Sequence, residues 1–127
     1  MTTQPRILVV DDEPEMCQIL TLQLSQAGYE VDCISDAASA LLKLASNSFD
    51  LVLTDLMMPG MNGIDLLRMI RKLGNDVPVI VFTGRESLDS AIAATHLRVS
   101  DYLAKGTTSG PELLAAIERA LNEPPPG

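Results

Sequence analysis

Five polar residues stand at or just after the ends of short apolar runs in this sequence. They are Asp11, Asp12, Asp55, Thr83 and Lys105. In an open α/β sheet, ligands bind outside the carboxyl ends of the strands, where the strand order reverses. If the apolar runs are parallel strands in the order 2-1-3-4-5, the first and third strands flank that point. We therefore expect Asp11, Asp12 and Asp55 to share one crevice.

Three carboxylates in one crevice need a cation or a proton between them. Two like charges about 4 Å apart repel by about 4 kcal/mol at an effective dielectric near 20. Oxygen ligands that leave room for water and phosphate favour Mg²⁺ over an all-protein Ca²⁺ cage or a Zn²⁺ site. A metal, the Lys105 ammonium, the Thr83 hydroxyl and a spare carboxylate together are typical of phosphoryl transfer. The spare carboxylate can then act as the nucleophile.

The elements that must position these groups follow from the alternation of apolar runs with amphipathic stretches. Runs that are apolar at every residue are typical of strands buried on both faces of a parallel sheet. We predict an α/β fold: a single flavodoxin-like, doubly wound (βα)5 domain with a parallel five-stranded sheet in the order 2-1-3-4-5. The expected strands are 7–10, 31–34, 51–53, 79–82 and 102–103, and the expected helices are 14–27, 37–45, 62–73, 87–95 and 111–121.

Local signals add detail to two of these helices. The helix over 14–27 has an apolar stripe that includes Ile19, and Gly28 is placed to cap its C-terminus. Ser109 and Glu112 have the spacing of a capping box, which predicts the start of the last helix.

Length and composition indicate one domain. The chain has 127 residues, of which 46% are hydrophobic, enough for a core without metal or disulfide staples. We assign 1–122 to that domain and 123–127 to a Pro-rich tail or the start of a linker.

Charge and spacing exclude several other classes. With 17 Asp and Glu against 9 Lys and Arg, the net charge of −8 disfavours direct binding to nucleic acid or to an anionic membrane. The first apolar run is too short for a signal peptide or a membrane span, so we expect a cytoplasmic protein. Cys17 and Cys33 do not form a C-x-x-C pair, and we expect two reduced thiols.

The sequence resembles the response-regulator receiver domain of two-component signalling over nearly its whole length. The stretches that carry the resemblance are 7–13 (ILVVDDE), 50–63 (DLVLTDLMMPGMNG), 81–84 (VFTG) and 101–105 (DYLAK). The resemblance implies a phosphorylation-dependent signalling switch with Mg²⁺ as cofactor, and not mainly an enzyme.

The resemblance also implies a role for each site residue. Asp55 would accept a phosphoryl group from a histidine kinase or a phosphotransfer protein. Asp12, Asp55 and the backbone carbonyl of Met57 would ligate Mg²⁺, and Asp11 would act through water. Lys105 would pair with the phosphoryl oxygens.

A second set of residues would carry the signal away from the site. By the same resemblance, Thr83 and Tyr102 would move on phosphorylation and change the face formed by the fourth helix, the fifth strand and the fifth helix. An output domain or a partner protein would read this face. A phosphorylation-dependent dimer stays open, although Ala116 stands where one large dimer-forming subfamily has arginine.

The sequence departs from the family pattern at three places. Gly106 replaces the usual proline after the lysine, so we predict a trans peptide at this bond, because a non-proline cis peptide costs about 2.5 to 4 kcal/mol. Arg98 and Val99 stand where a Gly-Ala pair is common. Met57 and Arg85 occupy the positions that orient the attacking water in relatives.

Three other functions fit the same architecture. An aspartate-nucleophile phosphatase commonly has an Asp-x-Asp pair, but Leu56 and Met57 follow Asp55 here. A flavin-binding domain would have a Ser/Thr/Gly-rich loop after the first strand, and this loop is acidic. A receiver-like scaffold with little phosphoryl turnover is opposed only by the complete set of site residues.

Overall fold

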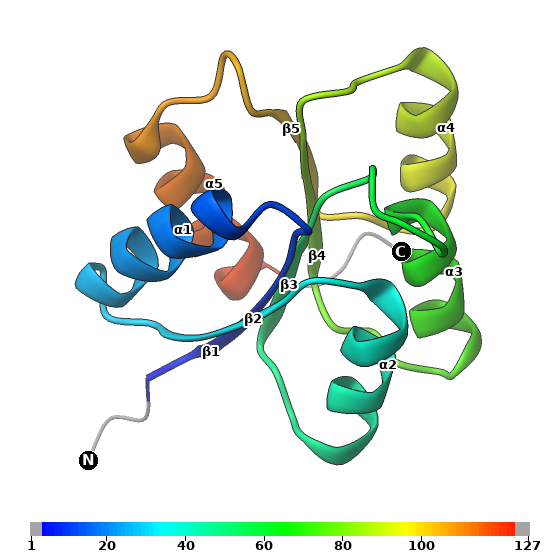
Figure 1. Cartoon of the computed structure of the whole chain (residues 1–127), viewed down its shortest axis with the longest axis horizontal. Coiled ribbons are helices and arrows are strands. Elements are labelled where there is room, and N and C mark those ends of the chain that lie inside the picture. The colour runs from blue at the N-terminus through cyan, green and yellow to red at the C-terminus, as the bar shows by residue number, and fades with distance from the viewer. Residues whose placement is uncertain (1–3, 124–127) are drawn as a thin grey trace.

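The computed structural model describes residues 4–123 and contains five strands and five helices in alternation (Figure 1). The sheet is parallel, in the predicted order β2-β1-β3-β4-β5. The strands are β1 (Arg6–Val10), β2 (Glu30–Ile34), β3 (Leu51–Thr54), β4 (Val79–Thr83) and β5 (Asp101–Ala104). The helices are α1 (Pro14–Gln26), α2 (Ala37–Ser46), α3 (Gly63–Lys72), α4 (Leu88–His96) and α5 (Gly110–Asn122).

Helices cover both faces of the sheet, so the core has two layers (Figure 1). One layer packs α1 and α5 on the sheet, and the other packs α2, α3 and α4. Strands β3 and β4 are buried at every residue, which is why their sequences are apolar up to the terminal Thr54 and Thr83. The carboxyl ends of β1 and β3 therefore project from strands that are packed between the two core layers.

The ends of the elements agree with the local signals. The capping box joins Ser109 and Glu112 at the start of α5, and Gly28 has a φ of 97° just after α1. The stripe assigned to α1 is wrong at Ile19, whose side chain is 57% exposed. Helix α1 instead buries Leu20 and Leu24, because it packs on α5 and the sheet through a narrower face than the pattern suggested. The predicted tail lies outside the described residues beyond Glu123.

The turn after α4 shows how the chain accommodates the missing Gly-Ala pair. Arg98 has a φ of 61°, a left-handed conformation that is unfavourable for a residue with a side chain. The Arg71 side chain of α3 holds this turn by donating to the carbonyl oxygens of Leu97 at 3.0 Å and of Arg98 at 3.3 Å. Arg98 in turn pairs with Asp76 at 3.0 Å. These bonds offset the strain at a position where the family that the sequence resembles commonly has glycine.

The expectation of two reduced thiols is wrong. A disulfide joins Cys17 in α1 to Cys33 in β2, and their Cα atoms are 6.0 Å apart, within the range that a disulfide spans. The two residues meet because β1 and β2 are parallel neighbours, and the helix that connects them packs back against β2. Their separation of 16 residues carries no sign of this contact.

In the described part of the chain, none of the helices is both long enough and apolar enough to cross a bilayer.

Candidate functional site

The three predicted carboxylates converge at the carboxyl ends of β1 and β3. Each strand is extended by one more backbone bond: the Asp55 amide donates to the Val10 carbonyl at 2.9 Å, and the Asp11 amide donates to the Ile34 carbonyl at 3.0 Å. One carboxylate oxygen from each of Asp11, Asp12 and Asp55 lies within 4.8 Å of the other two. Asp11 and Asp55 are buried, at 2% and 5% exposure, whereas Asp12 is exposed.

Backbone amides hold the Asp55 carboxylate in one orientation. Its Oδ1 accepts the amide of Leu56 at 2.7 Å and that of Met57 at 3.3 Å. The loop beyond it is tied to α3, because the Gly63 amide donates to the Leu56 carbonyl at 3.0 Å. The buried Thr54 hydroxyl donates to the carbonyl of Asp55 at 2.9 Å. A carboxylate held by these bonds is already oriented before any ligand binds.

Lys105 reaches the site from β5. Its Nζ lies 2.7 Å from Asp11 Oδ2, 2.9 Å from Asp55 Oδ2 and 3.1 Å from Glu13 Oε1, and its side chain is only 11% exposed. The predicted trans peptide to Gly106 is confirmed, because every peptide bond in residues 4–123 is trans. A trans bond therefore still delivers the ammonium to the carboxylates.

Burial and neighbouring charges have opposite effects on the pKa values of Asp11 and Lys105. Burial raises the pKa of the Asp11 carboxyl, although the Lys105 ammonium and the Glu13 amide both favour its ionised form. Burial opposes the charge on Lys105, but its hydrogen bonds to Asp11 and Asp55 outweigh burial and raise the pKa of Lys105 above its ordinary value. Lys105 therefore stays cationic throughout the neutral range.

Glu13 is a site residue that the sequence analysis missed. Its carboxylate is exposed and reaches Lys105, while the Glu13 amide donates to Asp11 Oδ1 at 3.0 Å. The only signal in the sequence is its place directly after Asp11 and Asp12. Nothing in that spacing indicates which of the three acids contacts the lysine.

Thr83 ends β4 as predicted and is fully buried. Its Oγ1 accepts the amide of Arg85 at 3.0 Å, a local bond at the strand end. The Thr83 carbonyl accepts the Lys105 amide at 2.8 Å, so the two predicted site residues are joined through the backbone. Thr83 thus lies on the strand between β3, which Asp55 directly follows, and β5, which Lys105 directly follows.

Tyr102 connects β5 to the start of α4. Its hydroxyl lies 2.6 Å from Ser90 Oγ and accepts the amide of Ser87 at 3.3 Å. Ser87 is the residue that caps α4. The ring is half-buried against the layer formed by α2, α3 and α4. In this arrangement the orientation of Tyr102 is tied to the first turn of α4.

The donor set fits a hard divalent cation. All three candidate ligands are carboxylate oxygens, which suit Mg²⁺. Lys105 binds Asp11 and Asp55 directly, and among residues 4–123 the Asp12 carboxylate has no hydrogen-bond or ion-pair partner. Of the three carboxylates, Asp12 is therefore the one that a cation can bind without displacing another partner.

Comparison with known proteins agrees with this geometry. The model of the response regulator receiver domain family matches residues 7–118. The response regulator MprA of Mycobacterium sp. (strain KMS) is 37% identical over 121 residues, which are 95% of this chain and 52% of that protein. The DNA-binding transcriptional regulator NtrC of Rhizobium meliloti is 40% identical over 122 residues, covering 96% of this chain and 25% of that protein.

Solved structures give the same result. A CheY-like receiver domain protein from Methanospirillum hungatei superimposes with a TM-score of 0.90 at 30% identity, covering 94% of this chain and 95% of that one. Response regulator TrrA from Thermotoga maritima, solved in complex with Mg²⁺-BeF, has a TM-score of 0.84 at 32% identity and covers 92% of this chain and 99% of its own. The chain belongs to the response-regulator receiver family, and it spans about half the length of curated relatives such as MprA.

Proposed function

We propose that this response-regulator receiver domain accepts a phosphoryl group on Asp55 from a histidine kinase or a phosphotransfer protein. The observation that carries the proposal is the convergence of Asp11, Asp12 and Asp55 with the Lys105 ammonium at one edge of the sheet. In the transfer, an Asp55 oxygen forms a bond to phosphorus as the bond from phosphorus to the donor nitrogen breaks. The nitrogen leaves with its electron pair.

Different residues of the chain contribute to different parts of this transfer. The amides of Leu56 and Met57 hold Asp55 Oδ1 in place, and Lys105 neutralises charge that develops on the phosphoryl oxygens. As the family resemblance implies, we assign Asp12, Asp55 and the Met57 carbonyl to Mg²⁺ and expect Asp11 to act through water. Bound Mg²⁺ would supply further charge neutralisation and alignment. TrrA in complex with Mg²⁺-BeF supports this assignment by similarity.

Intact-mass analysis tests the proposal directly. After incubation with acetyl phosphate and Mg²⁺, we expect the protein to gain one phosphoryl group and the Asp55→Asn variant to gain none, because an amide is not a competent acceptor. Asp65→Asn is the matched control: its carboxylate lies on α3, outside the site, and its labelling should equal that of the unchanged protein. An unlabelled protein would favour the receiver-like scaffold, and rapid net release of phosphate would favour the phosphatase.

The signal is proposed to leave through α4, β5 and α5. Thr83 is joined to Lys105 through the backbone, and Tyr102 is hydrogen-bonded to the start of α4, so a change at Asp55 has a short route to this face. On addition of beryllofluoride and Mg²⁺, amide NMR shifts should extend into these elements. The same additions to Asp55→Asn should leave α4 unchanged. Shifts confined to the loops around Asp12 and Asp55 would rule out the relay.

The phosphoryl group on Asp55 is expected to be long-lived. The side chain of Met57 is 52% exposed and offers water no useful hydrogen bond, and the Arg85 guanidinium is not a base. Loss of label from the isolated domain within seconds would contradict this prediction. In the Met57→Asn variant, an amide is available to orient water, and we expect decay of the label to accelerate about tenfold. Decay is followed by intact mass over time.

The partners of the domain follow from its place in such systems. NtrC is a DNA-binding regulator and MprA is a response regulator, and both are longer than the matched region. We propose that an output domain or a partner protein in the cytoplasm reads the α4, β5 and α5 face. We assign no contact with nucleic acid to this domain itself, because its net charge of −8 repels phosphate.

A further inference from the structure

The Cys17–Cys33 disulfide lies beside the acidic loop, outside the set of residues that phosphoryl transfer uses. Cys17 sits in the first turn of α1, where its amide donates to the Glu13 carbonyl at 3.1 Å. Cys33 is opposite Val9 in the β1–β2 register, and the next residue, Ile34, accepts the Asp11 amide at 3.0 Å. The disulfide covalently encloses residues 17–33. Together with the hydrogen bond from Asp11 to Ile34, it also completes a ring through residues 11–17 that includes Asp11, Asp12 and Glu13.

The acidic loop is held to the rest of the domain at both ends. One end is held by the hydrogen bond from Asp11 to Ile34, and the other by the first turn of α1. Cys17 Sγ also lies 3.6 Å from the Asp11 carbonyl oxygen. When the disulfide is reduced, the loop and the first helical turn are held to β2 by non-covalent contacts alone. A cross-link that restricts local opening is expected to slow that opening.

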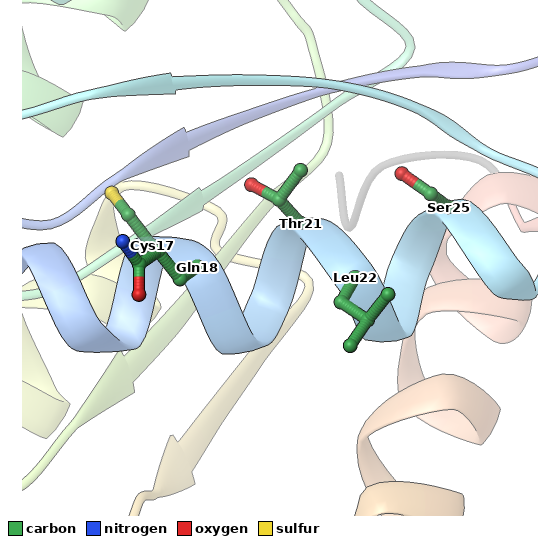
Figure 2. Close-up of a pocket in the computed structure, with 5 residues that line it drawn as sticks. All are labelled: Cys17, Gln18, Thr21, Leu22 and Ser25. Carbon is green, nitrogen blue, oxygen red and sulfur yellow. The ribbon is translucent and has the colours of Figure 1, made fainter.

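A small molecule can approach Cys17 from an open pocket on the surface of α1. Cys17 and Cys33 are each only partly buried. Cys17 lines an open pocket of about 440 Å³ along α1, together with Gln18, Thr21, Leu22 and Ser25. Figure 2 shows Cys17 at one end of this row of side chains, with its sulfur directed toward the strands. A structural disulfide in a dry core would have no such access.

We propose that Cys17 and Cys33 form a reversible thiol–disulfide exchange site whose oxidation state sets the mobility of the acidic loop 11–13. The co-reactant is a small-molecule disulfide. The thiolate of one cysteine attacks it, a bond forms between protein and reagent sulfur, and one reagent thiolate leaves and takes up a proton. The second cysteine then attacks the protein sulfur of this mixed disulfide and releases the second reagent thiol. Two electrons pass from the cysteines to the reagent.

In a cytoplasmic protein, a disulfide of this kind is typically redox-sensing or transient. Only the cytoplasmic setting rests on the proposed function. The exchange step and its effect on the loop do not, so the test uses neither phosphate nor metal.

The experiment equilibrates the whole chain in mixtures of 2-hydroxyethyl disulfide and 2-mercaptoethanol. This uncharged pair avoids repulsion by the net charge of −8. Remaining thiols are alkylated and counted by intact mass, and amide hydrogen exchange is measured in both states. We expect both thiols to be lost in excess disulfide and recovered in excess thiol. Amides of residues 11–17 should exchange about tenfold faster when reduced, with little change in β3 and β4.

Two variants serve as controls. A Cys17→Ser/Cys33→Ser double variant should exchange like the reduced protein in every buffer. A Cys33→Ser variant keeps one thiol and should take up one hydroxyethylthio group at Cys17, which tests access independently of the ring. Two alkylatable thiols that persist in excess disulfide would overturn the proposal, as would equal exchange of residues 11–17 in both states.

Discussion

The Asp12→Ala variant is expected to lose Mg²⁺ affinity by at least about tenfold and to label with acetyl phosphate correspondingly slowly. The oxygens of Asp11, Asp12 and Asp55 lie within 4.8 Å of one another, and Lys105 already occupies two of these carboxylates. Removal of Asp12 takes away the exposed acid that is available to the cation. The cation then has to compete with Lys105 for its remaining ligands.

Mg²⁺ binding is measured by NMR or calorimetric titration, and labelling by intact mass. Glu118→Ala removes the same charge from an exposed position on α5 and is the matched control. The control should bind and label like the unchanged protein, because a distant exposed charge acts weakly through solvent. Unchanged labelling of Asp12→Ala, or full labelling of the unchanged protein in EDTA, would refute the assignment of the metal site.

Gly63→Ala is expected to be the most destabilising small substitution near the site. A Cβ at this position would overlap the backbone oxygen of Asp55 and lie 2.9 Å from Leu56 Cα. Both obstacles are backbone atoms on the segment that carries Asp55, so the loop would have to move to relieve the overlap. The hydrogen bond from the Gly63 amide to Leu56 would be strained as well. We expect the free energy of unfolding to fall by about 2 to 4 kcal/mol.

Chemical and thermal unfolding measure this loss, and acetyl phosphate labelling shows whether Asp55 is displaced. Labelling should slow even at temperatures where the variant is folded, because the amides of Leu56 and Met57 that orient Asp55 move with the loop. Gly106→Ala is the control: nothing lies within 4 Å of a Cβ there, and the change in stability should stay within about 0.5 kcal/mol. Equal stability of the two variants would show that the close approach at Gly63 is not required.

The sequence alone was sufficient for the architecture and for most of the site. Apolar runs bounded by polar residues report which segments are buried, and a parallel sheet places the residues after each run at one edge. For this reason, the sequence alone was enough to place Asp11, Asp12, Asp55 and Lys105 at this edge of the sheet. The trans bond before Gly106 was also predictable, because its energy depends only on the residue that follows.

Contacts between side chains from distant elements were decided by the tertiary structure. The disulfide between Cys17 and Cys33 depends on how α1 packs back on β2, and the exposure of Ile19 depends on the width of the face that α1 buries. The spacing of apolar residues shows that a segment is helical. It does not show how wide the buried face of the helix is, or which element the helix packs against. Nothing in the sequence around Gly63 indicates a close contact with Asp55, because that contact requires α3 to approach the end of β3 closely.

For Lys105, the sequence determines one property and the tertiary structure determines another. Its place after an apolar run showed that it would reach the site, since a buried strand directs its end to the edge of the sheet. Which carboxylates it would bind was not determined, because Asp11, Asp55 and Glu13 are all within the reach of a flexible four-carbon stem. Local patterns along the chain determine elements and their ends. Distances between groups far apart in sequence are set by packing, and the chemistry of this site depends on those distances.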